Sequence, residues 1–235
     1  MENRIFARLA SNGNIKLGQS MGTFSKLYSD REFNTQYGTV KGTCGGHCEG
    51  CRNACYVAKS YRYGSVINGH ARNTLAFRND LQGSFESIDK QLTRKRKPFK
   101  DVRINQSGEI ESTTELLFWI VIARKHPETK FFLYTKNYDA VREIANSKVI
   151  VPDNFTCNIS IWHEQGIAEF NEFKHLSWIR AFVYDDGFDY SAYGLEIETY
   201  CRAYDKNGKL DHNVTCDKCR KCIDRDVKII GCYEH

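Results

Sequence analysis

Cysteine is the residue type whose number and spacing most clearly indicate chemistry in this chain. The sequence contains 10 cysteines, and four of them lie close together in CGGHCEGCRNAC, residues 44–55. Thiolates bind zinc and iron–sulfur clusters, and they form disulfides mainly in oxidising compartments. The chain begins MENRIFARLA, without the apolar stretch of a secretory signal. We therefore predict a cytoplasmic protein whose grouped cysteines bind metal.

The first cysteine group, Cys44, Cys48 and Cys51, has the spacing C-x3-C-x2-C on a glycine-rich loop. Three such thiolates can each bind one corner of a [4Fe–4S] cluster and leave the fourth iron open to another ligand. Cys55 follows one helical turn later, where it would close the cluster. Zinc is the alternative metal, but structural zinc sites usually combine two cysteine pairs separated by a longer loop. We favour an iron–sulfur cluster at this loop.

The second cysteine group lies near the C-terminus and consists of Cys216, Cys219 and Cys222. Its spacing, C-x2-C-x2-C, is that of three ligands of a ferredoxin-type [4Fe–4S] cluster. Cys232 is the expected fourth ligand, with Cys201 or His235 as alternatives. Zinc competes more closely here, because Cys219, Cys222, Cys232 and His235 would also form a Cys3His site. The sequence thus predicts one or two clusters, with zinc as the alternative at the second group.

The pattern of apolar residues predicts the elements that position both groups. Helices are expected at 66–95 with a break near Gly83, at 112–126, at 138–148 and at 167–176, and strands at 101–106, 130–136, 156–162 and 179–185. Strands that alternate with helices of this length predict a parallel sheet, either doubly wound or a full or partial barrel. We predict an α/β fold, a parallel β/α partial barrel over residues 1–195, followed by a Cys-rich metal-binding extension over 196–235.

Polar residues follow the predicted strands, at the carboxyl ends where catalytic and binding residues lie in such folds. These residues are Ser107–Glu109, Lys136 and Asn137, His163 and Glu164, and Asp185–Gly187. A strand at 37–42 would bring the first cysteine group to the same edge of the sheet. Lys136 and His163 are therefore candidate catalytic residues.

The first cysteine loop resembles the cluster loop of the radical S-adenosylmethionine enzymes. The resemblance extends to QSGE, which matches the glycine–glutamate motif after the second barrel strand, and to the serine of NISIWHE. It implies that Gly108 and Glu109 bind S-adenosylmethionine, that Glu109 holds its amino group, and that Ser160 contacts the same cofactor. One difference is Gly50, because these enzymes usually have an aromatic residue before the third cysteine.

Over residues 40–235 the chain also resembles the phage and prophage "gene product 88" family, in ACYV, HARNTLAFRND, RINQSGEIES and FFLYTK. This resemblance implies a radical-SAM-like fold with metal-binding cysteines, and it places a phage-encoded protein in the host cytoplasm.

Two functions follow from these observations. The first is an iron–sulfur enzyme that reduces S-adenosylmethionine to form a radical, with a nucleotide, nucleic acid or peptide as substrate. The second is a non-catalytic phage protein that binds nucleic acid and is stabilised by zinc or a closed cluster. The basic run 93–103 and the aromatic–basic segment 59–66 would form its binding surface, although a net charge of +5 does not require a polyanionic partner. The longest apolar run, 116–123, is too short to span a membrane.

Overall fold

The computed structural model describes residues 5–11, 17, 21–46, 48–94, 98–207, 209, 211 and 213–233 of the chain. Its elements are β1 (Ala10–Ser11), β2 (Met21–Thr23), β3 (Glu32–Thr35), β4 (Gly38–Lys41), α1 (Glu49–Asn53), η2 (Tyr56–Arg62), α2 (Gly64–Asn79), α3 (Leu81–Leu92), β5 (Asp101–Ile104), α4 (Thr113–Lys125), β6 (Lys130–Thr135), α5 (Tyr138–Ala145), β7 (Phe155–Ile161), α6 (Ile167–Phe173), β8 (Ile179–Asp185), η3 (Ser191–Tyr193), β9 (Thr199–Tyr200), α7 (Cys216–Cys219) and β10 (Ile229–Tyr233).

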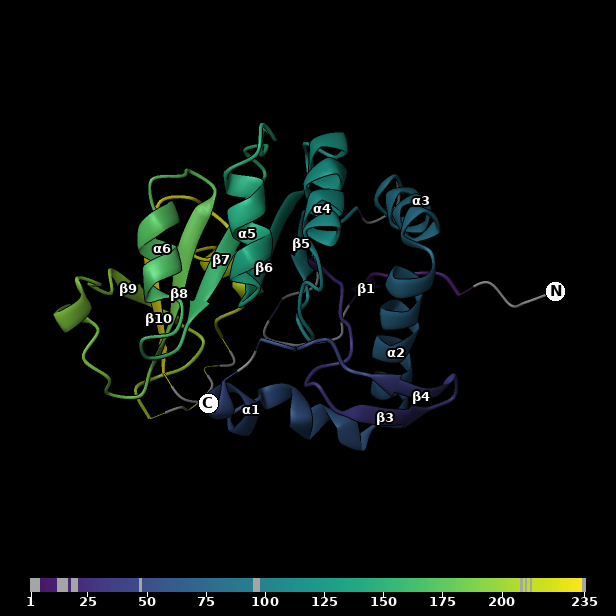
Figure 1. The fold of residues 1–235 in the computed structure, drawn as a ribbon, viewed down its shortest axis with the longest axis horizontal. Helices are drawn as coiled ribbons and strands as arrows, with labels where there is room; N and C mark the ends of the chain where they lie inside the picture. Colours follow the sequence, from purple (N-terminus) through teal and green to yellow (C-terminus); the bar gives the residue numbers. More distant parts are fainter. Residues whose placement is uncertain are drawn as a thin grey trace.

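A central sheet has the strand order β1-β2-β5-β6-β7-β8-β10-β9, in which only β1 is antiparallel to its neighbour. From β2 to β8 the order in the sheet follows the order in the chain. Right-handed crossovers between successive neighbours place every connecting helix on one side. Accordingly, α4, α5 and α6 all cover one face (Figure 1). The predicted parallel α/β fold is confirmed, but within the described residues the sheet ends at β1 and β9 and does not close into a barrel.

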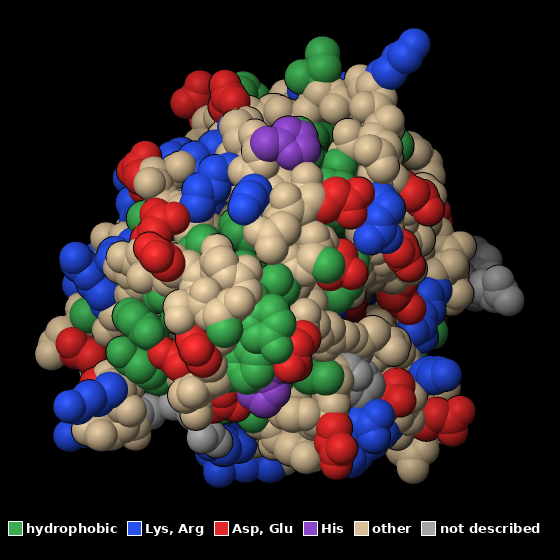
Figure 2. Space-filling model, turned by 60° about the vertical axis from the view of Figure 1, so that its left-hand side comes forward, with side chains coloured by type: hydrophobic (Ala, Val, Ile, Leu, Met, Phe, Trp, Pro, Cys, Tyr) green, Lys and Arg blue, Asp and Glu red, His purple; other side chains and the backbone are tan. Residues whose placement is uncertain are grey.

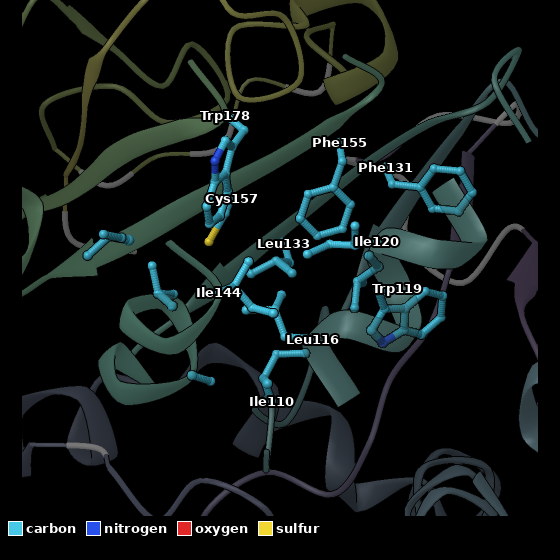
Figure 3. Packing of buried hydrophobic residues seen from close by; sticks show 14 of the residues in the cluster. Ile110, Leu116, Trp119, Ile120, Phe131, Leu133, Ile144, Phe155, Cys157 and Trp178 are labelled. Atoms are coloured by element: carbon cyan, nitrogen blue, oxygen red, sulfur yellow. The ribbon is translucent and has the colours of Figure 1, made fainter. Parts of the chain in front are cut away.

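The hydrophobic core lies between this face and the helices. Leu133 of β6 and Phe155 of β7 point toward Leu116 and Ile120 of α4 and Ile144 of α5 (Figure 3). Each of these side chains is at most 3% exposed. Burying one such side chain stabilises the fold by about 1.5–3 kcal/mol. Packing of this layer therefore fixes the sheet on which the site is built.

The predicted helices and strands are found at the expected places, with one shift in a helix break. The helix expected over 66–95 divides into α2 and α3, and the break falls at Asp80 rather than near Gly83. The Asp80 carboxylate accepts a hydrogen bond of 2.8 Å from the Gly83 N–H. Asp80 thus caps the second helix, and an N-cap aspartate starts a new helix more effectively than a glycine breaks one.

The strand expected at 37–42 is β4, but it is not part of the central sheet. It pairs antiparallel with β3 in a separate two-stranded sheet. The strand of the central sheet that precedes the first cysteine group is β2, which pairs with β5. The chain then continues through the β3–β4 hairpin before it reaches Cys44.

The residues after 195 contribute to the same sheet, because β10 lies between β8 and β9 and pairs in parallel with both. The segment between β9 and β10 is hydrogen-bonded to β7. The Thr156 hydroxyl donates to the Ile223 carbonyl at 3.0 Å, and the Asn158 amide donates to the Cys222 carbonyl at 3.2 Å. The second cysteine group is thereby held against strand residues that alternate with the core residues and so face away from the helices.

Among the described residues, no helix combines the length and apolar character that crossing a bilayer requires. On the face shown in Figure 2, Lys and Arg side chains lie interspersed with Asp and Glu side chains. This face has no broad area of a single charge sign.

A buried ion pair fixes the segment after β2 to the start of α4. The Lys26 ammonium lies 2.6 Å from the Glu115 carboxylate, and the two side chains are 0% and 5% exposed. Glu111 is a second, more distant partner at 3.4 Å. Breaking a buried ion pair leaves an uncompensated charge in a medium of low dielectric.

We expect Glu115→Ala to lower the free energy of unfolding by about 3 kcal/mol, measured by urea denaturation. Arg142→Ala, which removes exposed ion pairs with Asp139 and Glu172, should cost less than about 1 kcal/mol. The double variant Lys26→Met/Glu115→Leu should recover most of the loss. Equal effects of the two single substitutions would contradict this account.

Candidate active site

The two cysteine groups line one cavity of about 300 Å³, although they are far apart in the sequence. The thiols on its wall are those of Cys44, Cys51, Cys55, Cys201, Cys216, Cys222 and Cys232. Strand residues that face away from the helices form another part of the wall, including Arg103, Tyr134 and Tyr184. Sequence reasoning treated the two groups as separate sites, and the fold brings them together.

Backbone hydrogen bonds position the first cysteine loop at the carboxyl edge of the sheet. The N–H groups of Thr43 and Cys44 donate to the carbonyls of Leu27 and Ser29, at 3.0 and 2.9 Å. The Thr43 hydroxyl also donates to the Leu27 carbonyl and accepts the Glu109 N–H, each at 2.8 Å. Cys44 is therefore fixed relative to both β2 and β5.

Cys48 is placed differently from the other members of its group. Its sulfur accepts the Cys51 N–H at 3.4 Å and caps α1. It is not part of the cavity wall, whereas Cys55 is. The structure thus places Cys55 beside Cys44 and Cys51 at the cavity.

Glu109 lies at the rim, where the cavity meets a larger open pocket of about 640 Å³. Its Oε1 accepts the Thr135 hydroxyl at 2.6 Å and the Ile110 N–H at 2.8 Å, and its Oε2 accepts the Lys136 N–H at 2.8 Å. Burial raises the pKa of this carboxyl, and the hydrogen bonds from Thr135 and the backbone oppose that rise. Because each carboxylate oxygen has two lone pairs, Oε2 can accept one more donor.

Three other predicted residues, Gly108, Lys136 and Ser160, also line the cavity. Gly108 has φ +81°, and a Cβ there would lie 2.7 Å from the Thr43 hydroxyl oxygen. The Lys136 side chain hydrogen-bonds to the Cys51 sulfur and opposes the rise in pKa that burial causes at that thiol. Gly108 and Lys136 are thus both close to the first cysteine loop.

His163 lies apart from the cavity wall. Its Nε2 is 2.8 Å from the Asp186 carboxylate, its ring stacks on Phe188, and its backbone has a positive φ of 51°. The residue before it, Trp162, does line the cavity. Trp162 stacks on Tyr184, with ring centroids 3.7 Å apart and planes at 10°.

Sequence reasoning missed Trp162, and the signal that would have found it is Gly50. A Cβ on Gly50 would lie 2.7 Å from the Trp162 indole. The aromatic ring beside the third cysteine thus comes from the end of β7, and glycine at position 50 makes room for it.

Arg103 supplies a buried positive charge next to the second cysteine group. Its guanidinium lies 4.7 Å from the centre of the Tyr134 ring and 3.4 Å from the Tyr56 hydroxyl. Its Nε has no hydrogen-bond partner among the described residues. Burial disfavours the charge, but Tyr56, Tyr134 and the neighbouring thiols keep the pKa of Arg103 above its ordinary value.

Burial also determines the ionisation of the thiols. It raises the pKa of Cys44 to about 12, with a further contribution from the Glu109 carboxylate. It raises the pKa of Cys222 to about 12 as well, although Tyr134 is hydrogen-bonded to that sulfur and opposes the shift. Metal binding replaces such thiol protons with a cation.

The donor set fits a metal or an iron–sulfur cluster in number and chemistry. None of the ten cysteines forms a disulfide, and seven of them line one cavity. Within the described part of the chain, no group of three or more His, Cys, Asp or Glu side chains is placed so that it could hold a metal ion. His235, an alternative ligand, and residues 95–97 of the basic run lie outside the described residues.

A family model described as Gene product 88 matches residues 8–225 of the chain. No curated protein and no solved structure matches the chain.

The contact between Gly50 and Trp162 gives a direct test of the first cysteine loop. We expect Gly50→Ala to displace α1 and to lower the metal content of the purified protein at least two-fold, measured by elemental analysis. Gly45→Ala is the matched control, because a Cβ there would meet nothing within 4 Å. Equal metal contents in the two variants would show that Trp162 does not constrain the loop.

Proposed function

The chain belongs to the gene product 88 family, and we propose that it is an iron–sulfur enzyme of the radical S-adenosylmethionine type. The observation that carries this proposal is the shared cavity, which cysteines of both groups line together on the face of the parallel sheet opposite α4, α5 and α6. Sequential strands with α4, α5 and α6 on one face are also the arrangement expected of a partial β/α barrel.

In this proposal Cys44, Cys48 and Cys51 bind a [4Fe–4S] cluster, and the second group binds another cluster or zinc. When bound, a cluster with one open iron supplies the electron that reduces S-adenosylmethionine. This chain's residues bind and orient S-adenosylmethionine for that reduction. Oε2 of Glu109 accepts a hydrogen bond from the ammonium group of S-adenosylmethionine. Lys136 lies beside the first cysteine loop. Trp162 and Tyr184 form an aromatic wall that excludes water.

A second candidate function is the non-catalytic one, with a closed cluster or zinc and a nucleic-acid surface. Its support is the position of Cys55 on the cavity wall beside Cys44 and Cys51. In the aromatic–basic segment, Tyr63 is 52% exposed and the Arg62 guanidinium lies 4.8 Å from its ring centre. Tyr61 is instead half-buried, and its ring packs against Tyr28 and Phe33.

Anaerobically purified protein should be brown, absorb near ~400 nm and contain about four or eight iron atoms per chain. Cys44→Ala should lose about four of these, while Cys55→Ala should keep them, because an open cluster needs three thiolates. An equal loss in the two variants would identify Cys55 as the fourth ligand and favour the second function. A colourless protein that contains only zinc would also favour it.

Glu109 allows binding of the cofactor to be tested separately from binding of the cluster. We expect Glu109→Gln to raise the dissociation constant for S-adenosylmethionine about ten-fold, which is about 1.4 kcal/mol, with the iron content unchanged. Glu169→Gln is the control, since Glu169 lines the larger pocket but not the cavity with the thiols. Isothermal titration calorimetry under nitrogen measures the dissociation constants of both variants for S-adenosylmethionine. Identical dissociation constants would show that Glu109 is not part of the binding site.

A further inference from the structure

A third, much smaller cavity of about 20 Å³ lies next to α7. Four thiols line it, those of Cys201, Cys216, Cys219 and Cys222. The other wall residues include Phe132, Ala203 and Val214, so the cavity is largely apolar. A single water occupies about 10–15 Å³ on this measure, so the space is of the size of one bound ion. Three of its four thiols also line the 300 Å³ cavity, into which a larger group could extend.

Cys201 is held in this position by the sheet. It follows β9 directly, and its backbone N–H donates to the Gly231 carbonyl of β10 at 2.7 Å. Cys201, Cys216 and Cys222 line both this cavity and the cavity of about 300 Å³, so the three residues lie close together. The chain thus brings a cysteine from the end of β9 to the C-x2-C-x2-C segment.

Cys232, the fourth ligand expected from spacing, is placed elsewhere. It lies on β10 opposite Tyr184 of β8 and is 2% exposed. Its thiol donates to the carbonyl of the adjacent residue, Tyr233, at 3.5 Å. It is part of the wall of the 300 Å³ cavity but not of the small one.

We propose that the second metal site is formed by Cys201, Cys216, Cys219 and Cys222, with Cys201 in place of Cys232. This inference rests on the proposed function only in requiring that the second group binds metal. Four thiolates accept Zn²⁺ or a fully ligated [4Fe–4S] cluster, and both leave the metal without an open position. The site therefore stabilises the fold or carries electrons, and the substrate is left to the first cysteine loop.

The position of Arg103 is consistent with such a site. Four thiolates with Zn²⁺, or with an oxidised [4Fe–4S] cluster, have a net charge of about −2. Arg103 lies in the cavity wall near Cys216 and Cys222, where its guanidinium offsets part of that charge. Such neighbouring groups tune a metal site without binding the metal.

The test compares Cys201→Ala with Cys232→Val in the full chain, by iron and zinc content per folded chain after anaerobic purification. Valine fills the buried position of Cys232 as a small apolar side chain. Cys201→Ala should lose the metal of one site, either one zinc or about four iron atoms. Cys232→Val should keep the metal content of the wild type. The absorption spectrum near ~400 nm then shows which metal was lost.

Loss of metal from folded Cys232→Val overturns the proposal, and so does an unchanged metal content in Cys201→Ala. If Cys201→Ala does not fold, Cys201→His provides a second test, since histidine can bind either metal and should restore the content. Wild-type protein without any metal would instead contradict the proposed function. Loss of iron only on substitution of Cys44 would leave that function intact and refute the second site.

Discussion

The site depends on a small set of hydrogen bonds around the turn after β5. The Glu109 carboxylate joins that turn to the end of β6 through Thr135 and the Lys136 N–H. The Glu109 N–H joins it to Thr43, next to the first cysteine. One residue therefore sets the distance between the cysteine loop and two strand ends. Since loops carry function only when a rigid scaffold positions them, these bonds make the loop part of the sheet edge.

A second constraint is the unequal character of the two faces of the sheet. In β6, Phe131 and Leu133 pack toward the helices, while Tyr134 faces the cavity. In β5, Arg103 faces the cavity between the core residues Val102 and Ile104. Parallel sheets are usually apolar on both faces, because helices cover both. Here one face is covered instead by the cysteine-lined cavity of about 300 Å³, where the charge of Arg103 requires compensation.

Much of the fold could be predicted from the sequence, because helix caps and apolar periodicity are local signals. Ser112 at the start of α4 is an example. Glu109 and Lys136, which follow predicted strands, line the cavity, and so does Ser160, which was expected from the resemblance to the radical S-adenosylmethionine enzymes. His163, which also follows a predicted strand, has a left-handed backbone and lies beside Asp186 rather than in the cavity wall. The meeting of the two cysteine groups was not predictable, since it depends on β10 entering the sheet beside β8. No local pattern encodes such a long-range pairing.

The place of β10 in the sheet has a consequence for how the protein is made. Within the described residues β9 pairs only with β10, and β10 is the last strand of the chain. During synthesis from the N-terminus, β9 therefore has no partner until residues 229–233 have emerged, while β2 to β8 can already assemble. The cavity of about 300 Å³ therefore stays open on this side until β10 has been synthesised. Removal of β10 would leave the thiols of this cavity accessible to oxidation.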